Sequence, residues 1–234
     1  RCQAWLTGFH NLAGKYVAIP AAVIAVFAGL FIGLKRLLAD RRKNGGGTTR
    51  EVAVSPDGAG LDDFAWRVSL AELREPGAFS SYPGVSRSLL LLEGEPVRLD
   101  IDGEPTVLVR GGEVVHFDGA ARVFATPAGV ALDAGVMSRD ARCRQHTRLV
   151  TLRGDGVLRR TAAEGLLLLL EGDPLRVRTS AGEGATLGPH DALRFGPGDA
   201  VEVQFSSAGA TRVLLAEFAP PGEARPGDGG GASG

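Results

Sequence analysis

Hydrophobic and polar residues alternate through most of the chain from residue 44 to residue 218, as they do in β-strands with one buried face. The segment FAWRVSLAEL is a clear example, because one face carries the apolar side chains of Phe64, Trp66, Val68 and Leu70. Arg67 and Ser69 occupy the opposite face. The chain contains 34 glycines and 13 prolines, which supply turns between such runs. The pattern predicts an all-β fold.

One hairpin pattern occurs twice. LLLLEGEPVRLDIDG begins at Leu89, and LLLLLEGDPLRVRTSAG begins at Leu166, with the Glu-Gly-acid-Pro turns 78 residues apart. The same offset places Phe117 on Phe195. Glycine permits a positive φ and proline fixes the residue that follows, so each copy predicts a hairpin. We interpret the repeat as an internal duplication that forms two jelly-roll-like β-barrel lobes.

The segment Tyr16–Leu34 contains nineteen uncharged, mostly apolar residues, enough for a helix across a bilayer core of ~30 Å. Lys35 and Arg36 follow it, so the positive-inside rule places the C-terminal side in the cytoplasm. We therefore predict an apolar N-terminal helix at 16–34 within a segment 1–34, and a cytoplasmic folded region at 35–218. Its lobes are expected at about 44–135 and 136–218. The Gly- and Pro-rich tail, 219–234, is expected to be disordered.

Charge and cysteine content exclude several classes of protein. The chain has 26 basic and 27 acidic residues, without the basic excess of a nucleic-acid binder. Cys2 and Cys143 lie too far apart in sequence to suggest a disulfide framework or a cysteine zinc site. The four histidines are isolated in the sequence, so we predict no metal and no other cofactor.

Three segments resemble the HutD/Ves family of two-lobed cupins, which is linked to histidine utilisation in some bacteria. They are KNGGGTTREVAV (Lys43–Val54), FAWRVSLAEL (Phe64–Leu73) and GAFSSYPGVSRSLLLLEG (Gly77–Gly94), in the order and spacing of the family. The resemblance implies a bicupin fold over roughly Leu34 to Phe218. Two departures are the absence of Pro-Trp before Asn44 and the presence of Gly135 where the family has an asparagine.

The resemblance also implies a ligand pocket in the first lobe. The glycine-rich stretch would lie at the pocket mouth and offer polar groups from Asn44, Thr49 and Glu51; the alternative is a plain turn that enters a strand. Arg67 would either line the barrel or face solvent. These alternatives stay open at the level of sequence.

Arg87 falls where a metal cupin places its glutamate ligand, seven residues before Gly94. Ser80 and Tyr82 fall near the usual His-x-His pair. An arginine beside hydroxyl groups suits an anion rather than a metal ion. Asp133 would orient an arginine or bind a ligand amine, or else belong to a turn. His116 is expected to be a half-buried sheet residue rather than a base.

The function predicted first is binding of a small anionic metabolite, such as formylglutamate or urocanate, with modulation of histidine utilisation; this link rests on the resemblance. The second is a metal-independent enzyme that acts on a small carboxylate. The third is a non-catalytic, membrane-tethered interaction module. No nucleophile triad or carboxylate pair at a recognisable spacing assigns a catalytic residue. A homodimer is left open.

Overall fold

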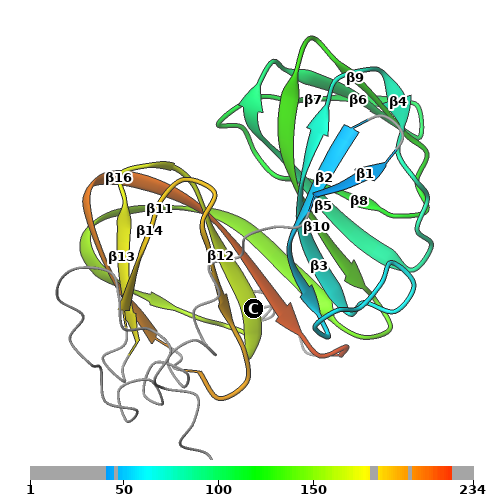
Figure 1. Ribbon diagram of the computed structural model, residues 1–234. Helices are drawn as coiled ribbons and strands as arrows, with labels where there is room; N and C mark the ends of the chain where they lie inside the picture. The colour runs from blue at the N-terminus through cyan, green and yellow to red at the C-terminus, as the bar shows by residue number, and fades with distance from the viewer. Residues whose placement is uncertain (1–40, 45–46, 180–183, 200–201, 223–234) are drawn as a thin grey trace, which may run out of the picture. The chain divides into compact units, whose positions relative to one another are not determined.

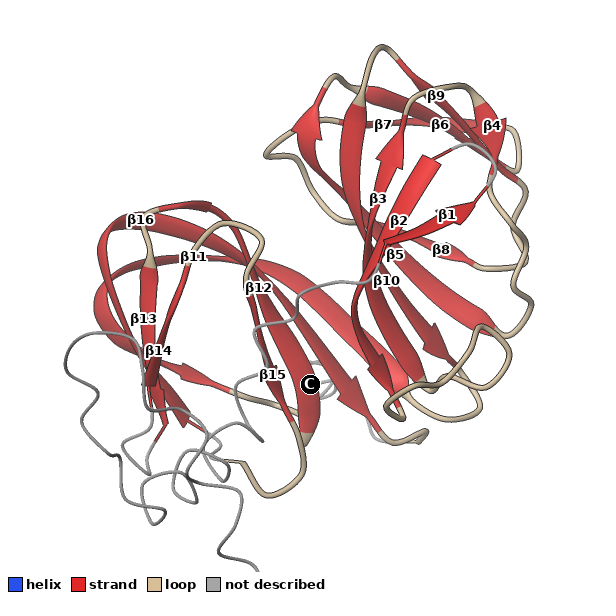
Figure 2. Cartoon of the chain, viewed as in Figure 1, coloured by secondary structure: helices blue, strands red, loops and turns tan. Residues whose placement is uncertain are grey.

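The computed structural model describes residues 41–44, 47–179, 184–199 and 202–222, which form two β-lobes (Figures 1 and 2). The first lobe contains β1 (Arg41–Asn44), β2 (Gly47–Ser55), β3 (Trp66–Leu73), β4 (Gly77–Ala78), β5 (Val85–Gly94), β6 (Val97–Ile101), β7 (Glu104–Leu108), β8 (Val115–Asp118), β9 (Val123–Pro127) and β10 (Ala131–Arg139). The second lobe contains β11 (Arg144–Arg159), β12 (Glu164–Gly172), β13 (Leu175–Thr179), β14 (Gly184–Leu187), β15 (Ala192–Phe195) and β16 (Glu202–Ala219).

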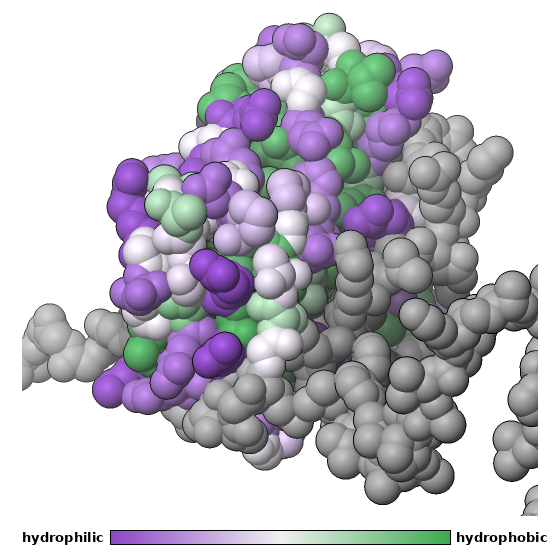
Figure 3. Space-filling model, turned by 60° about the vertical axis from the view of Figure 1, so that its left-hand side comes forward, coloured by the Kyte–Doolittle hydropathy of each residue, from purple (hydrophilic) through white to green (hydrophobic). Residues whose placement is uncertain are grey.

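Two sheets build the first lobe, in the strand orders β1-β2-β3-β10-β5-β8 and β4-β9-β6-β7. One sheet, ordered β14-β13-β16-β12-β15 with β11 also paired to β16, curls to build the second. The first lobe extends through β10 to Arg139, a few residues beyond the boundary expected after residue 135. Polar side chains predominate on the outward face seen in Figure 3, as the alternation along the strands requires.

The repeated hairpins have the same strand pairing in both lobes. β5 pairs with β10 and β8, and β12, which lies 78 residues further along, pairs with β16 and β15. Both central strands carry a bulge at the same place, because Leu92 and Leu170 are each skipped in the register with the neighbouring strand. The second lobe is the more continuous one: β11 and β16 each cover a region that the first lobe divides between two strands.

Gly94 and Gly172 explain why the Glu-Gly-acid-Pro turn occurs twice. Their φ angles are +89° and +107°, which favour glycine over residues with a Cβ. A Cβ on Gly94 would lie 2.0 Å from the carbonyl oxygen of Val130, and one on Gly172 would lie 2.2 Å from that of Ala210. Both turns therefore need glycine for the conformation and for the close approach of a neighbouring strand.

The predicted fold class is wrong in its N-terminal helix. The part of the chain that the structure describes consists of strands, turns and loops and contains no helix, and thus no helix that could cross a membrane. The predicted helix at 16–34 lies outside the described residues, as does the tail beyond residue 222. The fold that the described residues support is all-β.

The two lobes pack through their long central strands. A shared core joins first-lobe side chains such as Val68, Leu90 and Val136 to second-lobe side chains such as Leu168 and Leu214. All five are less than 3% exposed. Trp66, Val68 and Leu70 of the predicted apolar face are thus buried between the lobes, whereas Phe64 belongs to a separate first-lobe cluster.

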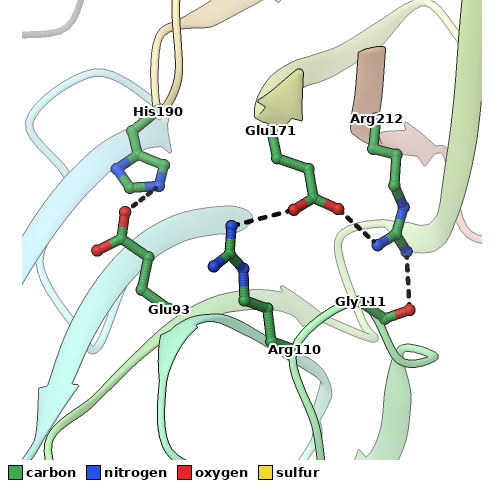
Figure 4. Close-up of polar contacts among 6 residues, drawn as sticks. All are labelled: Glu93, Arg110, Gly111, Glu171, His190 and Arg212. Carbon is green, nitrogen blue, oxygen red and sulfur yellow. Dashed lines mark hydrogen bonds and ion pairs between the residues drawn. The ribbon is translucent and has the colours of Figure 1, made fainter. Parts of the chain in front are cut away.

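A cluster of charged side chains closes one end of this interface (Figure 4). Glu171 of the second lobe accepts a hydrogen bond from Arg110 of the first at 3.2 Å and one from Arg212 at 3.0 Å. Arg212 also donates to the carbonyl oxygen of Gly111 at 3.1 Å. The hydrogen bond from Arg212 is the main reason that the pKa of Glu171 is lowered, with Arg110 adding to the effect.

Replacing Glu171 by glutamine should lower the free energy of unfolding by about 0.5–1 kcal/mol, because the ion pairs are partly exposed and screened. The loss should be present above the ordinary carboxylate pKa and fade as the pH falls through the lowered pKa, since protonation removes the same charge from the native protein. Urea unfolding at neutral and acidic pH measures it. Glu93→Gln is a matched control, because Glu93 has one longer contact, 3.5 Å to Nε2 of His190. An equal loss in both variants would contradict the role of Glu171.

Candidate functional site

The register of the first-lobe sheet brings several predicted site residues onto the face that lines the lobe interior. Met137 on β10 lies opposite Arg67 on β3 and Arg87 on β5. Asp133 lies four positions before Met137 on β10, so both residues are on the same face of the sheet as Arg67 and Arg87. Its neighbours on this face are apolar residues of the first-lobe core, including Leu91. Two arginines and a carboxyl are thus directed into the lobe.

Glu51 and Arg67 form an ion pair on this face. The Nε–H of Arg67 donates to Oε2 of Glu51 at 3.0 Å, and the two side chains are 12% and 29% exposed. Arg67 therefore lines the lobe rather than facing solvent freely. Thr49 lies opposite Ala71 in the same sheet and is half-buried. Asn44 lies on β1, opposite Gly47, and its side chain is outside the described residues.

Arg87 lies among three aromatic rings. The guanidinium carbon is 5.1 Å from the ring centre of Phe79, 5.8 Å from that of Tyr82 and 5.0 Å from that of Phe117. Burial lowers the pKa of Arg87, while the charges of Tyr82 and Asp133 oppose that shift. Arginine remains protonated in proteins, so the surroundings hold a positive charge in a largely apolar environment.

The hydrogen bonding of Arg87 is incomplete. Its five N–H groups make one hydrogen bond to described residues, from Nη1 to the backbone carbonyl of Ser80 at 3.2 Å. Ser80 therefore contributes its backbone carbonyl, whereas the sequence predicts a role for its hydroxyl. The remaining donors are suited to a carboxylate, which binds a guanidinium through two parallel hydrogen bonds.

Asp133 is a buried carboxyl close to Arg87. It lies within β10 and is 3% exposed, so it is not a turn residue. Burial raises its pKa to about 7, and the charge of Arg87 acts in the opposite direction. Near neutral pH this carboxyl can carry or release a proton, and its charge state changes the field around Arg87.

In the second lobe an aromatic ring occupies the position equivalent to the Arg87 side chain. Gly165 stands 78 residues after Arg87 and pairs with Phe195 as Arg87 pairs with Phe117. A Cβ on Gly165 would lie 2.4 Å from the Phe195 ring, so the ring occupies the space of a side chain. Arg160 lies 4.6 Å from the centre of that ring and donates to the carbonyl oxygens of Ala163, Gly196 and Asp199. Arg160 uses its Nη groups to hold these carbonyls and leaves Nε without a partner among the described residues, whereas Arg87 makes a single hydrogen bond.

A second polar region, not predicted from the sequence, joins β5, β8 and β11. Oγ of Ser88 is 2.8 Å from Nδ1 of His116 and donates to Oε1 of Gln145 at 3.2 Å. Ser88 is buried and His116 is exposed, so His116 is not the half-buried residue expected. The sequence signal for this region is Ser88, a polar residue within the apolar strand β5. Its partner Gln145 on β11 is 57 residues away.

No group of three or more His, Cys, Asp or Glu side chains within the described ranges is placed to hold a metal ion. The absence of a metal stays a prediction, and metal analysis of the purified protein is its test. Cys143 is buried, and burial raises the pKa of its thiol to about 12, which disfavours the reactive thiolate.

The family model described as HutD matches residues 35–214. A protein of 21.2 kDa from the hutC 3′ region of Pseudomonas putida, itself uncharacterised, is 33% identical over 154 residues, which cover 65% of this chain and 79% of that one. Protein Ves of Citrobacter koseri is 31% identical over 121 residues, covering 51% of this chain and 62% of Ves.

Solved structures agree with these matches. A conserved protein of unknown function from Pseudomonas aeruginosa has a TM-score of 0.71 at 27% identity, with 80% of this chain and 97% of that chain covered. HutD from Pseudomonas fluorescens has a TM-score of 0.63 at 28% identity, with 79% and 97% covered. A cupin 2 barrel protein from Leptotrichia buccalis, with a TM-score of 0.54 at 7% identity over 75% of this chain and 90% of that chain, shows the cupin-like fold alone.

Proposed function

The chain belongs to the HutD family, and on that premise we propose that its first lobe binds a small carboxylate metabolite through Arg87 and so modulates histidine utilisation. The observation that carries the proposal is the guanidinium of Arg87, held among Phe79, Tyr82 and Phe117 with one of its five N–H groups bonded to the protein. The half-buried aromatic rings lower the polarity around the guanidinium, which strengthens a charged hydrogen bond formed there.

The charges around Arg87 support an anion as the ligand. Arg67 is neutralised by Glu51, whereas the carboxyl near Arg87 is Asp133, whose raised pKa leaves much of it uncharged near neutral pH. The site therefore retains a net positive charge. The histidine link comes from the family name and from the hutC neighbourhood of the Pseudomonas putida relative.

Replacing Arg87 by alanine should weaken carboxylate binding roughly ten- to a hundredfold, since a charge-assisted hydrogen bond contributes about 1.5–3 kcal/mol. Arg87→Lys should recover part of the affinity, because an ammonium cannot make the paired hydrogen bonds of a guanidinium. Calorimetric titration with formate, N-formylglutamate and urocanate measures these changes.

Arg122→Ala is the matched control, because the Arg122 side chain is 89% exposed and lies outside the site. Its affinity should equal that of the unmodified protein. Equal affinities in the Arg87 variants as well would contradict the proposal and leave the ion-paired Arg67 as the next candidate.

A metal-independent enzyme on a small carboxylate is the second candidate, and Asp133 is the observation that favours it. A buried carboxyl with a pKa of about 7 can donate or accept a proton near neutral pH. Incubation of the protein with the same three carboxylates, followed by mass spectrometry, separates the two functions. A product formed by the unmodified protein and absent with Asp133→Asn would favour the enzyme.

A further inference from the structure

Exposed apolar side chains gather on the outward face of the sheet β4-β9-β6-β7 in the first lobe. Phe124 on β9 is 48% exposed and Val107 on β7 is 56% exposed. Pro105, two residues before Val107, is exposed as well. Leu99 on β6 and Leu108 on β7 point the other way, into the first-lobe core. The sheet therefore has apolar side chains on both faces.

The strand register gathers the outward side chains into one surface, which we call the outer patch. Strand β6 runs through its middle, with β9 on one side and β7 on the other. The patch consists of six side chains in two adjacent rows across the sheet, namely Phe124, Asp100 and Pro105 in one row and Thr126, Arg98 and Val107 in the next.

The duplication supplies a comparison for the outer patch, because β16, β13 and β14 have the same pairing in the second lobe. The equivalent residues, in the same order, are Gln204, Arg178 and Gly184, then Ser206, Arg176 and Thr186. These six include no large apolar side chain, although Val157 beside Gln204 is 50% exposed. Exposure to water is compatible with the polar version of this face, so the apolar version in the first lobe indicates a partner.

The partner is expected against the face of the sheet rather than beside its edge. Strand β7 is the edge strand, and Pro105 within it has no backbone N–H to pair with a further strand. Two sheets that meet face to face interdigitate their side chains at a separation of about 10 Å. The apolar side chains of the outer patch suit this kind of packing.

The charges of the outer patch make it complementary to itself. Arg98 and Asp100 lie two residues apart on β6, which is about 7 Å along a strand. Arg98 is exposed and makes no hydrogen bond or ion pair with a described residue. Asp100 accepts the backbone N–H of Gly103 through Oδ1 at 2.8 Å, which leaves Oδ2 as an acceptor. A twofold axis that lies between two such sheets and crosses β6 at Leu99 places Arg98 of each copy over Asp100 of the other.

We propose that the outer patch is the contact surface of a homodimer of this chain. Two reciprocal Arg98–Asp100 ion pairs fix the register, and the same axis sets Pro105 of one copy over Val107 of the other. The apolar side chains are then removed from water while each charge gains a partner. Each copy contributes six side chains, fewer than the roughly 20–30 residues of a standard interface, so the dimer is weak.

Sedimentation velocity of the full chain over a range of concentrations tests the association. We expect monomer at about 1 µM and an increasing fraction of dimer toward about 0.5 mM, as for a small interface. A chain that stays monomeric throughout would overturn the proposal and leave the outer patch to a different protein. Residues 1–40 are the same in every variant below, so differences among the variants report on the outer patch.

Arg98→Glu and Asp100→Lys should each weaken the association more than tenfold, because each places two pairs of like charges in the interface. A one-to-one mixture of these two variants should associate as the unmodified chain does, since every acid then faces a base. Recovery in the mixture is specific to a patch that pairs with itself. Variants that associate normally, or a mixture that stays monomeric, would overturn the proposal.

Val107→Lys is a further variant, needed if Asp100→Lys fails to fold after losing the acceptor of the Gly103 N–H. It should weaken the association about tenfold, because it replaces an apolar contact by a charge. Thr186→Lys is the matched control, since Thr186 is exposed at the same register position of the second lobe. This control should associate as the unmodified chain does, and circular dichroism shows that each variant is folded. An equal loss in Val107→Lys and Thr186→Lys would overturn the assignment of the outer patch.

Discussion

Replacing Trp66 by alanine is expected to lower the free energy of unfolding by about 3–5 kcal/mol, as for other buried aromatic residues. The Trp66 side chain is 1% exposed and lies at the junction of the lobes. Its ring is stacked on Phe218, with centroids 4.4 Å apart and planes 3° from parallel. Its Nε1–H donates to Oε2 of Glu164 at 2.7 Å, and Arg194 covers the ring at 4.8 Å. The substitution leaves a cavity in the interface and removes a donor from Glu164.

Urea unfolding followed by circular dichroism measures the loss. Trp66→Phe is the comparison, because it retains an aromatic ring beside Phe218 and removes the N–H donor; about 1–3 kcal/mol should be lost. In a Glu164→Gln background the cost of Trp66→Phe should be smaller, since the charged acceptor is already absent. A loss below about 1 kcal/mol for Trp66→Ala would show that the lobe junction contributes little to stability.

The sequence predicted the parts of this structure that depend on local pattern. The alternation in FAWRVSLAEL indicates which face of β3 is buried, and the turn glycines fix both repeated hairpins. The constant offset also relates Arg87 to Gly165, so an asymmetry between the lobes can be read from the sequence. That comparison distinguishes the arginine of the first lobe from the filled space of the second.

Other features depend on contacts that no local pattern encodes. Arg160 fills the second-lobe position, yet the repeat relates it to Tyr82 and not to Arg87. The hydrogen bond from Ser88 to Gln145 crosses the junction of the lobes. From the sequence Arg67 could either line the barrel or face solvent, and the register of β2 and β3 places it beside Glu51. The N-terminal helix was inferred from hydropathy alone, and the described residues provide no helix.

The contribution of Asp133 to the free energy of unfolding should become less favourable as the pH rises from about 4 to about 8. Burial raises the pKa of Asp133 from 3.8 to about 7. Between these values the unfolded chain releases the proton while the native protein retains it, so the native state binds more protons and loses stability with increasing pH. A shift of about three pKa units corresponds to about 4 kcal/mol once both states are ionised.

Asp133→Asn removes this titration. The variant should be close to the unmodified protein in stability at about pH 4 and more stable by up to about 4 kcal/mol at about pH 8. Urea unfolding of both proteins across this range gives the difference. In an Arg87→Ala background the difference should keep growing to a higher pH and reach a larger value, because Arg87 now lowers the pKa of Asp133 in the native protein. A difference that does not change with pH would contradict the buried, neutral carboxyl.

The same substitution should alter the pH dependence of carboxylate binding. As Asp133 loses its proton near pH 7, its negative charge opposes an anionic ligand at Arg87, so affinity in the unmodified protein should decrease between about pH 6 and pH 8. Asp133→Asn should bind with nearly constant affinity over this range, because Arg87 stays charged and the amide does not titrate. Calorimetric titration with formate at each pH measures both curves. Parallel curves for the two proteins would show that Asp133 does not influence the ligand, and would separate the role of this carboxyl in stability from any role in binding.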